Sequence, residues 1–244
     1  MNSERDVLSV RDLRKSFKKK VVVDGVNLTV SRGEIVGLLG ANGAGKSTTF
    51  YMMIGRILPD SGHVMISEND VTFLPMYMRA KMGIGYLPQE ASIFRQLNVL
   101  DNLRLVLAQR GLDEPSAGAV CDKLVDELGL AHIATEAGYA LSGGERRRVE
   151  IARCLAMDPS FILLDEPFSG IDPVAVGDLQ EVISDLKARG YGILLTDHNV
   201  RETLSITDRT YIMHQGSIVV DGPPDVVAND PLAIKYYLGD RFEW

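Results

Sequence analysis

One glycine-rich segment, set between an apolar run and a helical run, limits the folds open to this chain. Residues Gly40–Thr48 (GANGAGKST) fit the pattern GxxxxGK[ST], in which glycines permit unusual backbone turns and direct amides toward phosphate oxygens. The preceding run GEIVGLLG is typical of a buried parallel strand, and the following KSTTFYMMIG is typical of a helix. Together they predict an α/β fold with a phosphate site at the N-terminus of that helix.

Two side chains of this loop have specific expected roles. Lys46 is expected to reach the β- and γ-phosphates of a triphosphate, and the Ser47 hydroxyl is expected to bind Mg²⁺. The glycine order GxxGxG differs from the dinucleotide fingerprint GxGxxG, which disfavours a nicotinamide enzyme. The loop residues expected to bind the nucleotide are Gly40, Asn42, Gly43, Ala44, Gly45, Lys46, Ser47 and Thr48.

Two adjacent acids follow a second apolar run. Residues Phe161–Leu164 are typical of a buried strand and lead into Asp165, Glu166 and Pro167. Ligands of open parallel sheets bind at the carboxyl ends of strands, and adjacent strand residues point to opposite faces, so the two acids can differ in role. We expect Asp165 to hold Mg²⁺ and Glu166 to orient and deprotonate an attacking water. The alternative is a pair of solvated acids in a turn, which the phosphate loop upstream disfavours.

Four segments occur in the order that marks the ATP-binding cassettes of ABC transporters, and the chain resembles that family over nearly its whole length. They are GANGAGKS, LSGGE at residues 141–145, FILLDEP and LLTDHN. The resemblance implies a P-loop NTPase with a RecA-like core, an antiparallel β subdomain and an inserted helical subdomain. It also implies binding and hydrolysis of ATP with Mg²⁺. In that family two cassettes pack head to tail, so the resemblance implies a homodimer.

The LSGGE segment has an expected role across the dimer. Ser142, Gly143 and Gly144 stand where a predicted helix over residues 145–157 begins, and they present a hydroxyl, free amides and the helix dipole. By the resemblance, these three residues contact the γ-phosphate held on the partner's phosphate loop. A simple helix N-cap is the alternative for Ser142, and the two roles are compatible.

Other residues gain roles only through the resemblance. Phe17 stands where the family places an aromatic that stacks on adenine, with a place in the core as the alternative. Gln89, in GYLPQE, matches the glutamine that senses Mg²⁺ and the attacking water. His198 matches the histidine that contacts the γ-phosphate. Ile171 and Ala41 depart from the commoner leucine and proline, and neither change removes a reactive group.

A further loop is a candidate partner surface. Ile93, Phe94 and Arg95 precede the helical stretch NVLDNL and are predicted to form an exposed loop. In the family that the chain resembles, this region lines the groove for coupling helices of the membrane subunits. Aromatic and arginine side chains are common interface hot spots, so Phe94 and Arg95 are expected to bind the partner. The alternative is that Phe94 packs within its own helical subdomain.

Composition limits the partners and the compartment. The net charge of −7 argues against a nucleic-acid-binding surface, and the basic run Arg146–Arg148 is interpreted as a solvated or interface helix face. Two cysteines suit a reducing cytoplasm. The chain shows no signal-peptide core and no run of about 18 apolar residues. We therefore expect a protein on the cytoplasmic face of the inner membrane, held there only through integral membrane permease subunits.

The chain is predicted to form one cassette over residues 1–244. Its core is expected to comprise residues 1–88 and 158–244, with a helical subdomain over residues 89–157 that includes an acidic loop at Asp113–Pro115. A basic turn at Lys18–Lys20 separates two predicted antiparallel strands. The strands expected from the sequence are residues 8–17, 21–30, 33–40, 161–164, 192–196, 209–213 and 217–220.

The catalytic motifs do not identify the cargo. The stretch GYLPQEASIFRQLNVLDNL, together with ERRRVEIARCLA, LLTDHNVRETL and the closing YYLGDRFEW, resembles the ATPases of lipopolysaccharide export in Gram-negative bacteria. This resemblance implies an ATPase dimer that drives lipopolysaccharide from the inner membrane toward the outer membrane. The alternatives are the ATPase of a branched-chain amino-acid importer and a soluble ABC ATPase of cluster assembly. DNA-maintenance members are disfavoured because no long coiled coil interrupts the chain, and Glu166 and His198 oppose a scaffold without hydrolysis.

Overall fold

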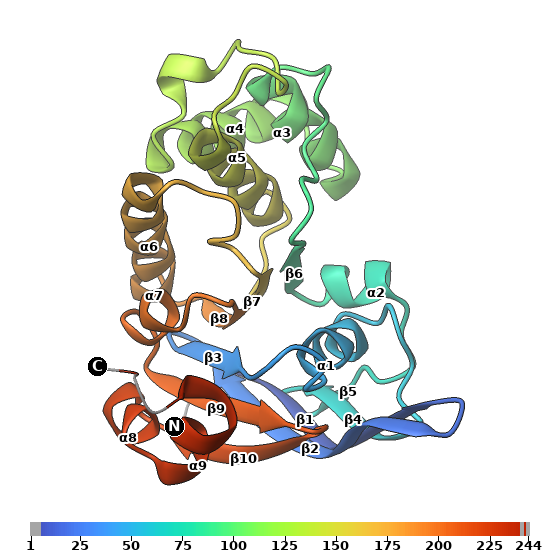
Figure 1. The fold of residues 1–244 in the computed structure, drawn as a ribbon. Helices are drawn as coiled ribbons and strands as arrows, with labels where there is room; N and C mark the ends of the chain where they lie inside the picture. The colour runs from blue at the N-terminus through green and yellow to red at the C-terminus, as the bar shows by residue number, and fades with distance from the viewer. Residues whose placement is uncertain (1–5, 240–241, 243–244) are drawn as a thin grey trace, which may run out of the picture.

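Two β-sheets organise the chain, which the computed structural model describes over residues 6–239 and 242 (Figure 1). One sheet is antiparallel, in the order β2-β1-β4-β5, and the other has the order β10-β9-β3-β8-β7-β6. The second sheet is parallel apart from the antiparallel pair β9–β10. The strands are β1 Val7–Phe17, β2 Lys20–Ser31, β3 Ile35–Leu39, β4 Ser61–Ile66, β5 Asn69–Asp70, β6 Ile84–Leu87, β7 Phe161–Asp165, β8 Gly192–Thr196, β9 Arg209–His214 and β10 Ser217–Gly222.

The central strands of the parallel sheet are apolar because both of their faces are covered. Every residue of β3 (IVGLL), β7 (FILLD) and β8 (GILLT) is buried, as expected for parallel strands between helices. The register pairs Asp165 of β7 with Thr196 of β8, and β3 pairs with β8 in the same direction. The segments that leave these three strands therefore start from one edge of the sheet, where ligands of open α/β sheets bind.

Helices cover the parallel sheet on both faces. In Figure 1, α3, α4 and α5 gather at one end of the molecule, whereas α1 and α2 lie beside the antiparallel sheet. No helix among the described residues is long and apolar enough to cross a membrane. The helices are α1 Lys46–Met53, α2 Met76–Lys81, α3 Val99–Leu107, α4 Glu114–Glu127, α5 Gly143–Leu155, α6 Pro173–Ala188, α7 Val200–Leu204, α8 Pro224–Ala228 and α9 Pro231–Ala233, with 3₁₀ turns at Ala108–Arg110 and Ala131–Ile133 and a π-helical turn at Ile234–Leu238.

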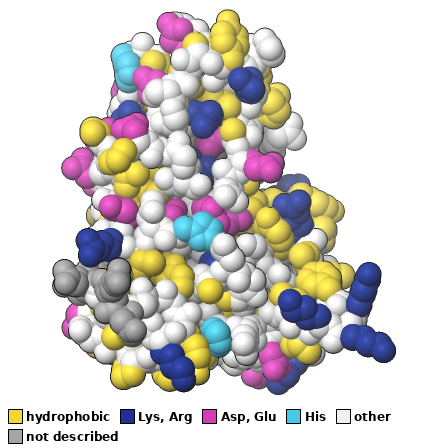
Figure 2. All heavy atoms as spheres, in the orientation of Figure 1, with side chains coloured by type: hydrophobic (Ala, Val, Ile, Leu, Met, Phe, Trp, Pro, Cys, Tyr) yellow, Lys and Arg dark blue, Asp and Glu magenta, His cyan; other side chains and the backbone are white. Residues whose placement is uncertain are grey.

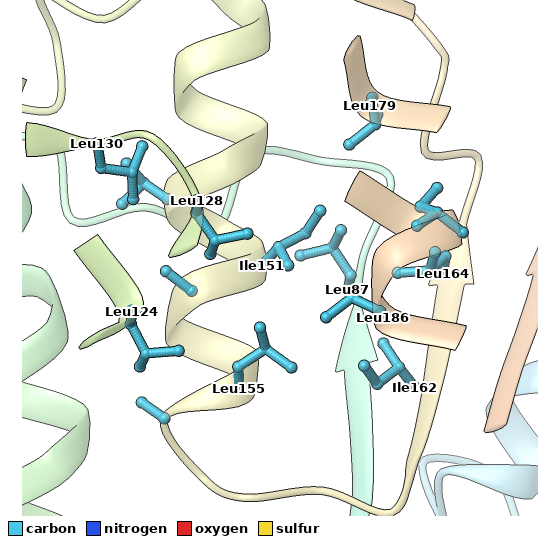
Figure 3. Packing of buried hydrophobic residues seen from close by; sticks show 14 of the residues in the cluster. Leu87, Leu124, Leu128, Leu130, Ile151, Leu155, Ile162, Leu164, Leu179 and Leu186 are labelled. Atoms are coloured by element: carbon cyan, nitrogen blue, oxygen red, sulfur yellow. The ribbon is translucent and has the colours of Figure 1, made fainter. Parts of the chain in front are cut away.

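Two apolar clusters hold these layers together. Figure 3 shows the first, in which Ile151 of α5 faces the sheet residues Leu87, Ile162 and Leu164, while Leu124 of α4 packs on the other side of α5. The second cluster places α1 between the two sheets, so Phe50, Met52 and Met53 are fully buried against both. The helix that follows the glycine-rich loop is therefore fixed along its length by packing.

The predicted hairpin is confirmed, since β1 and β2 pair in antiparallel fashion. The predicted acidic loop at residues 113–115 is wrong. Asp113 is the N-cap of α4, where its carboxylate accepts a hydrogen bond from Ser116 N at 2.9 Å. Glu114 and Pro115 form the first turn of that helix, a position where an acid and a proline are both favourable. Part of the closing YYLGDRFEW segment, residues 240, 241, 243 and 244, lies outside the described residues.

Candidate functional site

The glycine-rich loop connects β3 to α1 and encloses its own lysine. Lys46 is 8% exposed, and its Nζ donates to Gly40 O at 2.6 Å and to Ala41 O at 3.2 Å. Gly45 has a φ of +111°, and an added Cβ would lie 2.7 Å from Val22 O. Only glycine fits this left-handed, crowded position. The loop therefore needs this backbone shape to bring its amides to the start of α1.

A surface pocket extends from this loop to two side chains at the carboxyl ends of neighbouring strands, Glu166 after β7 and His198 after β8. Seven of the eight predicted loop residues line the pocket, and Gly40 instead accepts the Lys46 hydrogen bond behind it. Ser47 is exposed at this surface. The complete lining is Val22, Asn42, Gly43, Ala44, Gly45, Lys46, Ser47, Thr48, Glu166 and His198.

Three predicted catalytic side chains meet at Glu166. Gln89 Nε2 donates to Glu166 Oε2 at 2.5 Å, and His198 Nε2 lies 2.7 Å from Glu166 Oε1. The Glu166 side chain is 12% exposed, and its backbone N–H donates to Thr196 O at 2.7 Å. Segments that follow three different strands therefore converge on one carboxylate.

Glu166 does not lie on a strand, which corrects the argument that strand alternation separates it from Asp165. β7 ends at Asp165, and Glu166 has a φ of +48°. A non-glycine residue in this left-handed region costs about 1 to 3 kcal/mol and is frequent at functional sites. The two acids are separated by this backbone turn, which leaves Asp165 inside and carries Glu166 to the pocket.

Asp165 is buried at 4% exposure and accepts a hydrogen bond from the Tyr86 hydroxyl at 3.2 Å. Burial raises the pKa of Asp165, while the Tyr86 hydrogen bond acts in the opposite direction. Burial also lowers the pKa of Lys46, and the negative charges of Glu166 and Asp165 oppose that change. The lysine and both acids therefore share one electrostatic environment.

The oxygen atoms at this edge are of the type that Mg²⁺ prefers. Ser47, after β3, offers a hydroxyl, and Asp165 offers a carboxylate at the end of β7, which β8 separates from β3 in the sheet. Within residues 6–239 and 242, no group of three or more His, Cys, Asp and Glu side chains could hold a metal. Mg²⁺ does not need such a cage, because it is usually bound by one or two protein ligands, water and substrate phosphates. The residues therefore fit a magnesium ion that is bound together with a nucleotide.

Ser142, Gly143 and Gly144 begin α5 and do not line the pocket of their own chain. Ser142 is exposed and forms a capping box with Glu145, in which Glu145 N donates to Ser142 Oγ at 3.3 Å and Ser142 N donates to Glu145 Oε2 at 2.9 Å. The N-cap interpretation of Ser142 is thus confirmed. The amides and the positive end of the α5 dipole are thus not part of the pocket at the phosphate loop of the same chain.

Phe17 ends β1 and is 46% exposed, which contradicts a place in the core. It does not line the pocket, and Lys15 Nζ lies 5.7 Å from its ring centroid. Val22, on the neighbouring strand β2, does line the pocket. A ring at the end of this hairpin is accessible to an incoming planar group.

The loop before α3 is exposed only in part. Phe94 is 45% exposed and Arg95 is exposed, but Ile93 is 6% exposed and belongs to the helical cluster. The expectation of an exposed Ile93 is therefore wrong, because its side chain turns inward to pack. Phe94 is covered on one side by Arg153, whose guanidinium carbon lies 4.6 Å from the ring centroid.

A mainly apolar groove adjoins this loop. It runs between α2, β6 and α5, and Figure 2 shows hydrophobic side chains gathered over the position of α2. Met76, Tyr77 and Met78 of α2, and Phe73 just before it, are exposed hydrophobic residues. The groove is lined by Ile54, Met76, Arg79, Ala80, Ile84, Gly85, Tyr86, Leu87, Ser92, Val106, Glu150, Arg153, Cys154 and Met157.

Arg147 lies near the site, which the sequence did not predict. The interpretation of Arg146–Arg148 as a solvated helix face is therefore wrong at Arg147. Arg147 is 6% exposed and donates to Glu150 Oε2 at 3.1 Å and to Pro88 O at 2.8 Å. It also donates to the Asp165 backbone oxygen at 3.3 Å. The helix turns this residue inward, and the glutamate three residues later is the sequence signal that could have identified the pair.

Replacing Arg147 by methionine should destabilise the fold strongly. Removing one member of a buried ion pair leaves the other charge uncompensated, which costs about 3 to 5 kcal/mol. Arg146→Met is the matched control, because Arg146 is only partly buried and surface changes usually stay within about 0.5 kcal/mol. Urea unfolding measures both free energies, and equal values for the two variants would contradict the structural role of Arg147.

Comparisons with known proteins agree in one family. The family model described as ABC transporter matches residues 23–169. The lipopolysaccharide export system ATP-binding protein LptB of Acidithiobacillus ferridurans is 52% identical over 98% of this chain and 99% of that protein. LptB of Escherichia coli K12 is 51% identical over 96% of this chain and 98% of that protein. Among solved structures, the ADP conformation of MJ1267, an ATP-binding cassette of an ABC transporter, superposes with a TM-score of 0.86 at 27% identity, covering 96% of this chain and 99% of that one.

Proposed function

The chain belongs to the ABC transporter family as an ATP-binding subunit that hydrolyses ATP, and from this premise we propose that it energises lipopolysaccharide export. The observation that supports this cargo is the sequence identity of 51% to 52% with ATPases of lipopolysaccharide export over nearly the full length of both chains. We propose that hydrolysis drives lipopolysaccharide out of the inner membrane and toward the outer membrane. The two alternative functions are the ATPase of a branched-chain amino-acid importer and a soluble ATPase of cluster assembly, and an experiment must distinguish both from lipopolysaccharide export.

Glu166 is the general base of the proposed reaction. It accepts the proton of the attacking water, because a positioned carboxylate is a competent acceptor when it faces the reacting phosphate. Its hydrogen-bond donor Gln89 and the His198 ring, whose Nε2 lies 2.7 Å from Oε1, fix the orientation of the carboxylate from either side. His198 lines the same pocket as Lys46, which supports its contact with the γ-phosphate.

The phosphate loop binds and neutralises the triphosphate. The backbone amides from Asn42 to Thr48 cradle the phosphates, and Lys46 contacts the β- and γ-phosphates as a charge-assisted donor. Ser47 and Asp165 hold Mg²⁺ with the participation of Gln89. When bound, Mg²⁺ supplies charge neutralisation and polarisation of the transferred phosphate. Phe17 stacks on the adenine, which its exposed ring supports.

The active unit is a head-to-tail homodimer. Ser142, Gly143 and Gly144 serve the nucleotide of the partner, which is supported by their absence from the pocket of their own chain. The free amides and dipole at the start of α5 suit a γ-phosphate. Each nucleotide is then enclosed by the phosphate loop of one subunit and the α5 N-terminus of the other.

Residues 1–244 form one cassette, with a helical subdomain over residues 89–157 inserted into a core of residues 1–88 and 158–244. Strands β6 and β7 pair directly, yet α3, α4 and α5 lie between them in the chain, which supports the insertion. The groove beside α2 receives integral membrane permease subunits, and Phe94, which packs against the groove residue Arg153, and the adjacent Arg95 extend the same contact surface. The chain is therefore held at the cytoplasmic face of the inner membrane by protein partners and binds no nucleic acid.

Phe94→Ala should weaken capture of the membrane partner while ATP binding stays normal. A half-exposed aromatic under an arginine is a typical hot spot, and truncation of one costs about 2 kcal/mol or more, a loss of about thirtyfold in affinity. Val226→Ala is the matched control, since Val226 is an exposed apolar residue on α8, outside the groove. Pull-down from membranes measures capture. A lower melting temperature with unchanged capture would instead mean that Phe94 only packs within its subdomain.

Trapping the ATP-bound state tests the proposed cargo. The Glu166→Gln protein is incubated with ATP and Mg²⁺ in detergent-solubilised membranes, purified, and its partners are identified by mass spectrometry. Lipopolysaccharide-transport permeases are the expected partners. Branched-chain amino-acid permeases, or no integral membrane protein at all, would contradict the export function.

A further inference from the structure

Among the residues that the structure describes, Arg79 of α2 has the largest fully buried side chain. None of the ion pairs formed by these residues includes Arg79. Its exposure is 0%, and its guanidinium donates only to backbone oxygens. Nη1 donates to Met52 O at 2.6 Å and to Met53 O at 2.8 Å, Nη2 to Thr72 O at 2.6 Å and Nε to Leu74 O at 2.9 Å. Burial lowers the pKa of Arg79 to about 10, so it is protonated at neutral pH. The fold therefore contains a buried cation without a hydrogen-bonded carboxylate.

This cation lies at the C-terminal end of α1, the helix whose N-terminal end follows the phosphate loop. Met52 and Met53 are the last residues of α1, and Lys46 is the first. α1 carries no basic residue in its last turn and no acidic residue in its first turn. Arg79 thus supplies, from α2, the positive charge that a helix C-terminus usually receives from its own lysine or arginine.

The turn after α1 is shaped to admit the guanidinium. Gly55 has a φ of +80°, and an added Cβ would lie 2.8 Å from Arg79 Nε and 2.9 Å from Leu74 O. Any other residue would displace the arginine or the carbonyl that it binds. The guanidinium is therefore an integral part of this turn.

We propose that Arg79 strengthens the binding of the triphosphate electrostatically, acting through α1 from the end opposite the phosphate loop. The guanidinium offsets the negative end of the α1 dipole, which leaves the phosphate end positive. The eight residues of α1 span about 12 Å at 1.5 Å per residue. By Coulomb's law, one positive charge at that distance raises the affinity about twofold for each negative charge of the ligand in water. At an effective dielectric constant of about 20, the increase is about tenfold.

Two neighbouring charged side chains, Asp70 and Arg56, neither cancel nor replace the positive charge of Arg79 at the end of α1, because both are exposed. Asp70 acts on Arg79 from β5, but its carboxylate is 42% exposed and bonded to His63 and Thr72. Arg56 lies at the same end of α1, with its guanidinium carbon 4.7 Å from the Tyr51 ring centroid, and it is exposed. Water and salt screen both groups, whereas a buried charge is screened much less.

The test separates charge from packing by varying both the protein and the ligand. Arg79→Gln removes the charge, Arg79→Lys keeps it while changing the hydrogen bonds, and Arg56→Gln is the exposed control. Calorimetry with ATP and ADP in the presence of a chelator prevents turnover and gives two ligands that differ by one charge. We expect Arg79→Gln to lose at least about tenfold in ATP affinity and to lower the ATP-to-ADP affinity ratio by about two- to tenfold. Arg79→Lys and Arg56→Gln should keep that ratio within about twofold of the wild type.

Two results would overturn the proposal. One is an equal loss for ATP and ADP in Arg79→Gln, and the other is a lowered ATP-to-ADP ratio in Arg79→Lys. If Arg79→Gln does not fold, Arg79→Met, which also removes the charge, takes its place in the comparison with Arg79→Lys, and the same two results would overturn the proposal. The proposal rests on ATP binding and not on the cargo, so its failure leaves the export function untouched.

Discussion

Glu166→Gln should bind ATP normally and hydrolyse it about 10² to 10⁴ times more slowly, the usual contribution of a positioned proton acceptor. The amide has nearly the shape of the carboxylate and can still meet Gln89 and His198, so the pocket should remain intact. It cannot accept the proton of water at neutral pH. The ATP-bound dimer should therefore accumulate, which size-exclusion chromatography with ATP and Mg²⁺ can measure beside a phosphate-release assay.

Glu90→Gln is the matched control for this experiment. Glu90 is an exposed acid directly after Gln89 and does not line the pocket. Its loss should change turnover less than about twofold, because solvated surface charges contribute little. Turnover near the wild-type rate in Glu166→Gln would exclude Glu166 as the base.

Mixing two inactive variants should restore activity. Ser142→Arg keeps its own phosphate loop but blocks the start of α5, whereas Lys46→Ala keeps α5 but loses the charge-assisted contact to the triphosphate. Each homodimer has two defective sites. A heterodimer has one site built from the intact loop of one chain and the intact α5 of the other. An equal mixture should therefore recover up to about a quarter of the wild-type rate, since about half of the dimers are mixed.

The outcome depends on whether the α5 motif serves the partner. Neither parent alone should exceed its background in a phosphate-release assay, and calorimetry should show ATP binding in Ser142→Arg but weaker binding in Lys46→Ala. Loss of ATP binding in the Ser142→Arg monomer would mean that the motif serves its own chain. A mixture with no more activity than its parents, despite proven exchange of subunits, would also rule out a shared site.

The sequence predicted the parts of the site that depend on local pattern. The loop at residues 40–45 lies between a strand and a helix as expected, since glycine spacing and apolar runs determine both. The meeting of Gln89 and His198 at Glu166 could not be derived from the residues alone. It depends on the order of strands in the sheet, and only the family resemblance indicated it.

The residues that the sequence did not reveal owe their positions to tertiary packing. Arg79 and Arg147 appear in the sequence as ordinary surface cations, yet both are buried. Arg79 donates only to backbone oxygens, which leave no sequence signal, whereas Arg147 had one signal in Glu150, three residues later. Strands β4 and β5 were also not predicted, because β5 has only two residues and β4 buries just two of its six. β4 pairs with β1 and β5 pairs with β4, so both depend on a neighbouring strand and not on an intrinsic preference.

Lipopolysaccharide movement in a reconstituted complex tests the central claim most directly. The chain and the membrane proteins that it captures are placed in liposomes containing lipopolysaccharide. The ATP-dependent release of lipopolysaccharide to an acceptor is then measured over time. The wild-type complex should release lipopolysaccharide in step with ATP hydrolysis, and the Glu166→Gln complex should release almost none. Rapid ATP hydrolysis by the wild-type complex without any movement of lipopolysaccharide would contradict the proposed function.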